Sequence, residues 1–198
     1  MNFELLMPFI LVAYTMWATP GPNNMMLAYS GARFGIKLTI PHVFGIIFGT
    51  VILNILAILG LKPLIAQWPE SLLVLKVVGS IWLLKIGWKM AHSAKSGGDI
   101  EKEKPMRFMP AVLFQFANPK AISATLALVS LVLVALEKQP ALLWLVLMII
   151  PPLSLLSIIP WVLAGRSIRR FLSTPYRWKL FSWLTGGLTA SCALFLWI

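Results

Sequence analysis

The chain has 198 residues, of which 59% are hydrophobic and 12% are charged, with a mean hydropathy of +0.86 and a formal net charge of +11. A soluble domain carries about 45–50% apolar and about 25% charged residues, so the composition excludes an ordinary soluble protein and indicates a membrane protein. A strongly basic chain is also typical of nucleic-acid binding. Here the basic residues cluster between apolar segments, so we expect no nucleic-acid partner.

Six apolar segments are each long enough to cross a membrane, because a spanning helix needs about 20 apolar residues. The segment 71–91 is the least apolar, since Lys76, Lys85 and Lys89 interrupt it near its ends, where an ammonium can reach the interface. The sequence therefore predicts an all-α integral membrane protein with six transmembrane helices. These lie at about 5–28, 39–61, 71–91, 109–133, 141–164 and 180–198.

Basic residues in the connections between these spans predict which side of the membrane each connection faces. The second and fourth connections contribute Lys62 and Lys138. The first, third and fifth connections are far more basic, with Arg33, Lys37, Lys95, Lys102, Lys104, Arg107, Arg166, Arg169, Arg170, Arg177 and Lys179. Because basic connections stay in the cytoplasm, we expect the odd-numbered connections there and both chain termini on the opposite side.

A polar stretch at 92–107 divides the chain near its middle, and the two halves, 1–91 and 108–198, share a feature. Each half has a proline break inside its first span, ATPGP at 18–22 and ANPKA at 117–121. Three spans per half make the second half enter the membrane inverted, and paired breaks in inverted halves indicate a transporter's binding site. We therefore expect one transporter domain of two inverted three-helix repeats; two unrelated kinks are the alternative.

The chemistry of the first break suits an anion. Lipid offers no partner to the backbone groups that a break frees, so a break is tolerated where protein or a water-filled cavity receives them. Pro22 suits the first position of a new helix, and Gly21 before it supplies backbone freedom. The N–H groups of Asn23 and Asn24 then lie at a positive helix end, suited to a carboxylate.

Lys120, in the second break, lies too deep in its span to reach the interface. A charged side chain at such a depth is costly and is a functional candidate by default. We predict that its ammonium pairs with the carboxylate of a substrate, and a purely structural lysine is the alternative.

Two longer runs around the breaks, 19–36 (TPGPNNMMLAYSGARFGI) and 114–122 (FQFANPKAI), resemble the LysE/Rht family of bacterial amino-acid exporters. Members of this family share a Pro-Gly-Pro motif in the first span and an Asn-Pro-Lys motif in the fourth. The Asn23-Asn24 pair and the run LFQFANPK are most similar to the branch that exports cysteine and O-acetylserine.

The resemblance implies export of small amino acids or their derivatives across the bacterial inner membrane by proton antiport. In that membrane, the orientation predicted from the basic connections places both termini in the periplasm. A passive amino-acid channel and a structural membrane subunit are the alternatives. The motif residues that it assigns to the substrate site are Pro20, Gly21, Pro22, Asn118, Pro119 and Lys120.

Further candidates lie outside the motifs. Asn54, deep in the second span, either lines the pathway or bonds a neighbouring helix. His42, in the same span, is a proton-coupling candidate beside Lys120, because every acidic residue lies at a span end or in a connection; an interfacial histidine is the alternative. Gln115 is a weaker pathway candidate.

The residue types also limit the chemical reactions that the chain could catalyse. The chain has one cysteine and two distant histidines, and it has no nucleophile–base pair within the spans. We therefore expect a protein that is not an enzyme and that needs no cofactor or metal. The expected partners are a small amino acid, protons and lipid, and a homo-oligomer is compatible with the sequence.

Overall fold

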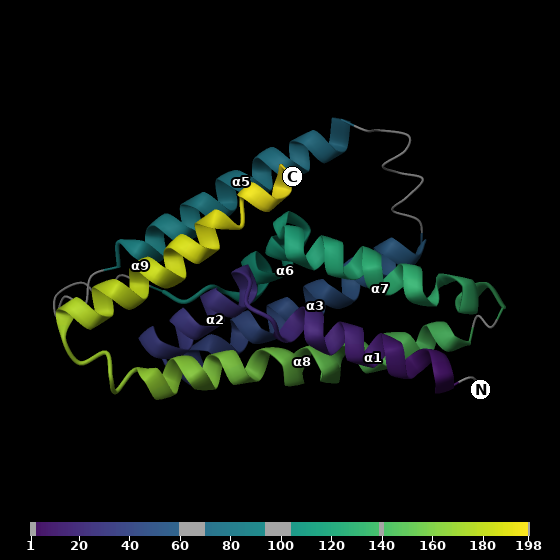
Figure 1. The fold of residues 1–198 in the computed structure, drawn as a ribbon, viewed down its shortest axis with the longest axis horizontal. Helices are drawn as coiled ribbons and strands as arrows, with labels where there is room; N and C mark the ends of the chain where they lie inside the picture. Colours follow the sequence, from purple (N-terminus) through teal and green to yellow (C-terminus); the bar gives the residue numbers. More distant parts are fainter. Residues whose placement is uncertain (1–2, 60–69, 94–103, 139–140, 198) are drawn as a thin grey trace.

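In a computed structural model of the protein, the structure describes residues 3–59, 70–93, 104–138 and 141–197. These residues form eight α-helices and one short 3-10 helix (Figure 1), so the all-α prediction is confirmed. The helices are α1 (Phe3–Ala18), α2 (Pro22–Arg33), α3 (Ile36–Leu59), α5 (Glu70–Ala91), α6 (Phe108–Ala117), α7 (Pro119–Lys138), α8 (Leu142–Ile168), α9 (Pro175–Ser191) and η1 (Leu194–Leu196).

Two helices of the described part are long and apolar enough to cross a membrane by themselves: α3 with 24 residues and α8 with 27. The pair α6 and α7 is a third candidate as one span that is bent by 69°. The other predicted spans coincide with helices that are short or interrupted by charge. Helices α1 and α2 are separate, α5 carries three lysines, and α9 carries Arg177 and Lys179 near its start. Length and composition thus identify two or three spans in the described residues.

The end of the chain departs from the predicted span at 180–198. Helix α9 already begins at Pro175, because Thr174 caps it by accepting a hydrogen bond from Arg177 N at 3.3 Å. It ends at Ser191, before η1. The pair Thr174-Pro175 is a helix start signal. Hydropathy does not detect it, because the residues that follow it are polar.

The helices of the two halves pack across each other. Helices α1 and α2 contact α8, helices α6 and α7 contact α3, and α5 runs alongside α9 (Figure 1). Glycines permit the closest approaches: a Cβ on Gly31 of α2 would lie 2.3 Å from Val162 O of α8. A Cβ on Gly45 of α3 would lie 2.5 Å from Phe108 O of α6. These contacts fix both broken segments against unbroken helices.

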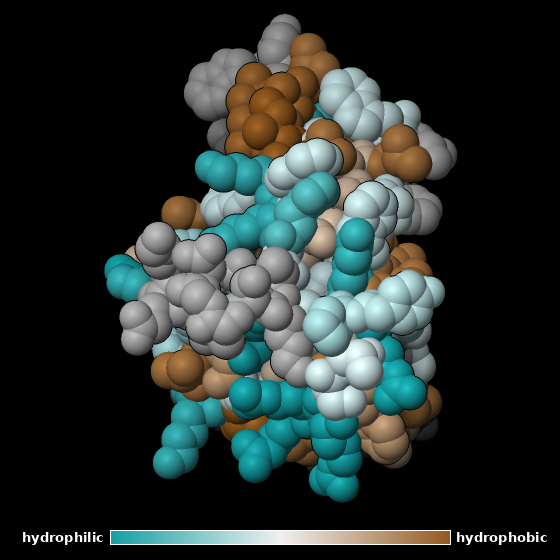
Figure 2. All heavy atoms as spheres, turned by 90° about the vertical axis from the view of Figure 1, so that its left-hand side faces the viewer, coloured by the Kyte–Doolittle hydropathy of each residue, from teal (hydrophilic) through white to brown (hydrophobic). Residues whose placement is uncertain are grey.

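One end of the molecule is strongly polar. The connections from α2 to α3 and from α8 to α9 lie at this end, where α5 also finishes, and α1 begins at the opposite end (Figure 1). Figure 2 views the polar end, over which hydrophilic residues are spread. The predicted basic connections therefore share one end of the molecule, although part of the third, 94–103, lies outside the described residues. The C-terminus lies near the middle of the long axis (Figure 1).

Candidate functional site

The two predicted breaks are present and touch each other. Helix α1 ends at Ala18 and α2 begins at Pro22, while α6 ends at Ala117 and α7 begins at Pro119. The side chain of Lys120, in the first turn of α7, reaches the chain between α1 and α2. The two breaks, which are distant in the sequence, therefore meet in the fold.

The start of α2 has no side-chain cap. Gly21 is the N-cap residue with an extended backbone, and Pro22 occupies the first helical position. Since glycine has no side-chain acceptor, the first N–H groups of the helix, on Asn23 and Asn24, receive no cap from it. A Cβ on Gly21 would lie 2.5 Å from Lys120 Cδ, so glycine is required for the lysine side chain to cross the break.

The start of α7 is capped by its own sequence. Asn118 is extended, and its Oδ1 accepts a hydrogen bond from Lys120 N at 3.1 Å. Its backbone oxygen accepts the first helical bond, from Ile122 N at 3.0 Å, and Pro119 occupies the first helical position. Asn118 and Pro119 therefore begin a helix, which accounts for two of the predicted site residues structurally.

The ammonium of Lys120 lies among oxygens at the end of α1. Its Nζ donates to Thr19 O, to Thr19 Oγ1 at 2.9 Å and to Pro20 O at 3.1 Å. An ammonium has three donors, and the structure supplies an acceptor for each of them. The C-terminal end of a helix is also its negative end, so this location favours a cation.

The remaining carbonyls at the end of α1 are bound by side chains from α2 and α8. Asn24 Nδ2 donates to Trp17 O at 2.8 Å and to Thr19 O at 2.7 Å. Trp161 Nε1 donates to Ala18 O at 3.0 Å. Side chains from two other helices thus supply the partners that lipid cannot offer to these carbonyls.

Amide side chains gather beside the break. Asn23 Nδ2 donates to Gln115 Oε1 at 2.8 Å, and Gln115 Nε2 donates to Asn23 Oδ1 at 3.2 Å, which joins α2 to α6. Asn24 is 2% exposed, and its Oδ1 has no hydrogen-bond partner among the described residues. From the sequence, Gln115 is a weaker candidate for the transport pathway. The structure places its side chain at the centre of this amide cluster.

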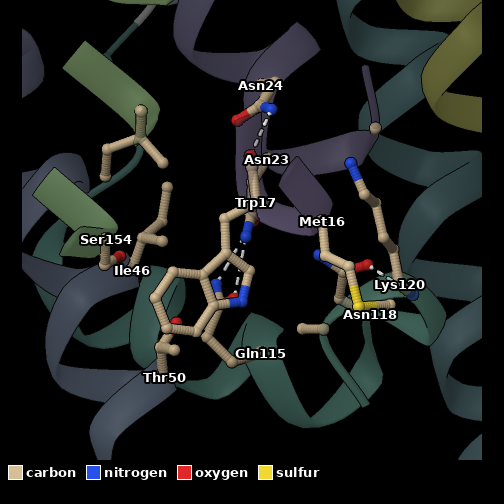
Figure 3. A pocket seen from close by; sticks show the side chains of 13 residues that line it. Met16, Trp17, Asn23, Asn24, Ile46, Thr50, Gln115, Asn118, Lys120 and Ser154 are labelled. Atoms are coloured by element: carbon tan, nitrogen blue, oxygen red, sulfur yellow. Dashed lines mark hydrogen bonds between the residues drawn. The ribbon is translucent and has the colours of Figure 1, made fainter. Parts of the chain in front are cut away.

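A small cavity of about 30 Å³ lies between the breaks (Figure 3). This volume admits water but not an amino acid, so the cavity must widen before it can take one. Thr50 and Ser154 line it as well, and the sequence did not single them out because a hydroxyl within a span usually bonds its own helix. The polar side chains that line it are Asn23, Asn24, Thr50, Gln115, Asn118, Lys120 and Ser154.

A larger cavity of about 400 Å³ lies on the other side of Lys120. Pro20, Pro22 and Pro119 line it, together with Ser123 and Cys192. Gly21 and Lys120 line both this cavity and the small one. The lysine side chain therefore lies at the boundary between the two spaces.

His42 lines a third cavity, of about 320 Å³, farther along α2. His42 is 1% exposed, and neither ring nitrogen has a hydrogen-bond partner among the described residues. Lys89, Lys104 and Arg107 line the same space, at the polar end of the molecule. The two predicted proton-coupling residues, His42 and Lys120, thus line different cavities.

Asn54 lines none of these three cavities. Its Nδ2 donates to Thr50 O within α3 at 2.8 Å and to Thr125 Oγ1 of α7 at 3.4 Å. This geometry matches the alternative in which Asn54 bonds a neighbouring helix.

Comparison with known proteins identifies the family to which the chain belongs. A family model described as "LysE type translocator" matches residues 14–198. The cysteine/O-acetylserine efflux protein of Klebsiella pneumoniae is 25% identical over 194 residues, which cover 98% of this chain and 97% of the relative. The leucine efflux protein of the same organism is 30% identical over 108 residues, covering 52% and 51%.

A cysteine/O-acetylserine efflux protein of Salmonella typhi is 26% identical over 154 residues, which cover 77% of each chain. No solved structure matches the chain. The family match extends over both helix breaks and all three cavities, and it confirms the resemblance that the two motifs carry. The chain belongs to the LysE family of translocators, and it is a multi-pass membrane transporter and not an enzyme.

Proposed function

We propose that the protein is a secondary transporter that exports a small amino acid or amino-acid derivative across the bacterial inner membrane. The observation that carries this proposal is the meeting of two broken helices around a cavity lined by buried amides, in a translocator. Broken helices with free backbone ends are typical of transporter sites. The efflux relatives named for cysteine, O-acetylserine and leucine support a neutral substrate.

The proposed membrane arrangement has six spans in two inverted repeats. The first repeat consists of α1–α2, α3 and α5, and the second of α6–α7, α8 and α9. The packing supports this assignment, because the broken span of each half contacts the second helix of the other half, and the third helices contact each other. Such reciprocal contacts are expected where a two-fold axis relates two repeats. The basic end of the molecule then faces the cytoplasm.

The proposed site uses the uncapped start of α2. A substrate carboxylate binds there to the N–H groups of Asn23 and Asn24, at the positive end of the helix. Pro20, Gly21 and Pro22 shape this part of the site. Asn118 and Pro119 hold Lys120 beside it, and the lysine supplies a positive charge to the carboxylate.

Proton antiport is the proposed coupling. Every acidic residue of the sequence lies at the end of a proposed span or in a connection, so no carboxylate lies in the interior of a span for this role. Among the titratable side chains that line the cavities, we assign coupling to His42 and Lys120, because Lys89, Lys104 and Arg107 lie at the polar end of the molecule.

Efflux from cells tests this function. Cells that express the protein are preloaded with labelled cysteine, O-acetylserine, leucine and other neutral amino acids, and the loss of each label is followed. We expect at least one to leave faster than from cells without the protein. Counterflow in proteoliposomes then separates a carrier from a channel, since only a carrier exchanges faster with substrate on the far side. If every label leaves cells with and without the protein at the same rate, the proposal is contradicted.

A further inference from the structure

The oxygens at the end of α1 form a cation site that the protein fills with its own side chain. We propose that the Lys120 ammonium is a displaceable internal ligand, and that the α-ammonium of the substrate takes its place among the oxygens of Thr19 and Pro20. This inference rests on the proposed function for the identity of the ligand. It assigns the substrate's second charged group to the C-terminal end of α1, beside the carboxylate at α2.

The chemistry of this site suits exchange. Lys120 Nζ is bound by the two backbone oxygens and the Thr19 hydroxyl, all of which are neutral. Within the described residues no carboxylate binds the lysine, so its departure leaves no buried anion there without a partner. A primary ammonium on a small molecule has the same charge and the same three donors. It therefore satisfies the same three oxygens.

The position of Lys120 links this exchange to opening. The lysine side chain crosses Gly21, where a Cβ would lie 2.5 Å from Lys120 Cδ and 3.1 Å from Nζ. Gly21 and Lys120 line both the cavity of about 30 Å³ and that of about 400 Å³. Movement of the side chain away from Thr19 therefore joins the two cavities and makes room for a substrate.

A neighbouring acceptor fits an ammonium as well. Asn24 Oδ1 is buried, lines the small cavity and has no hydrogen-bond partner among the described residues. The amide nitrogen of the same side chain is bound to Thr19 O, so the free oxygen is fixed close to the proposed cation site. A buried acceptor without a donor is costly, and a bound ammonium would supply one.

Ethylammonium tests the cation site, because it has an ammonium but no carboxylate. Its binding to the purified full-length protein in lipid nanodiscs is measured by calorimetry for the wild type and for Lys120→Met. In the wild type it must compete with a tethered ammonium at an effective concentration on the order of millimolar, so we expect Lys120→Met to bind it about tenfold more tightly. Adding Thr19→Val to Lys120→Met should remove most of this gain.

Lys76→Met is the matched control. Its ammonium lies 5.9 Å above the Trp197 ring and is not a donor to Thr19 or Pro20, so its removal should leave ethylammonium binding as in the wild type. Lys120→Gln, whose neutral amide retains two donors for the α1 carbonyls, should bind ethylammonium with an affinity between those of the wild type and Lys120→Met. If Lys120→Met does not fold, the comparison of Lys120→Gln with the wild type tests the cation site.

The inference is overturned if folded Lys120→Met and Lys120→Gln bind ethylammonium no better than the wild type. Lys120 is then a fixed cap of α1. This result would leave the proposed export untouched, because efflux is measured separately. Conversely, ethylammonium binding without efflux of any amino acid would support the cation site and contradict the proposed function.

Discussion

The two helix breaks satisfy their backbone groups in different ways. At the second break, Asn118 caps α7 through a bond to Lys120 N, two residues away. At the first break, Gly21 offers no cap, and the carbonyls of α1 are bound by Asn24, Lys120 and Trp161 from three other helices. A break that its own residues complete keeps its form when helices move. A break completed by other helices changes when they move, and for this reason we place the moving part of the site at the first break.

The largest effect is expected from the double substitution Pro20→Ala and Pro22→Ala. Alanine favours a continuous helix, so α1 and α2 should join and the N–H groups at the start of α2 should become internal. A hydrogen bond to a charged group contributes about 1.5–3 kcal/mol, so losing one corresponds to about 10–100-fold weaker substrate binding. Efflux from preloaded cells measures the loss, and immunoblotting of membranes checks insertion. Normal efflux would show that the break is only a kink.

Gly21→Ala is expected to have an intermediate effect. The added methyl group would lie 2.5 Å from Lys120 Cδ, so the flexible lysine must shift from Thr19 and Pro20. We expect export to change by about tenfold, which corresponds to about 1.4 kcal/mol, with little change in melting temperature. Gly187→Ala is the control, because a Cβ on Gly187 meets no atom within 4 Å. If the two alanine variants transport equally, the lysine does not depend on the space above Gly21.

Asn118→Ala is expected to have the smallest effect, and on stability more than on transport. Loss of an N-cap side chain costs about 0.5–2 kcal/mol of the free energy of unfolding. Asn118→Ser retains a capping oxygen and should recover most of this loss. Thermal unfolding in detergent compares the three proteins. If the serine variant is as unstable as the alanine variant, the second break is not held by its own cap.

The sequence predicted the elements of the site better than their connections. The Pro-Gly-Pro and Asn-Pro-Lys runs located both breaks, because each places a glycine or an asparagine directly before a proline, which is a start signal for a new helix. Proline alone is not enough, since α8 continues through three prolines. The donors that complete the first break were not foreseen. Trp161 resembles an interfacial tryptophan in the sequence, and only the packing of α8 against α1 brings it to Ala18 O.

Other parts of the site depend on helix orientation in the same way. Thr50 and Ser154 read as ordinary span residues, and the orientations of α3 and α8 turn them toward the cavity. His42 and Lys120 share a titratable character in the sequence, yet the fold places them beside separate cavities. Local signals therefore identified which residues are unusual, and tertiary packing decided which of them meet.

We propose that the exported amino acid binds between the two breaks. A structure determined with that amino acid bound tests it most directly. We expect the carboxylate of the amino acid to bind the N–H groups of Asn23 and Asn24. Its ammonium should bind the oxygens of Thr19 and Pro20 in place of Lys120 Nζ. An amino acid found instead in the cavity beside His42, with Lys120 still bound to Thr19, would contradict it.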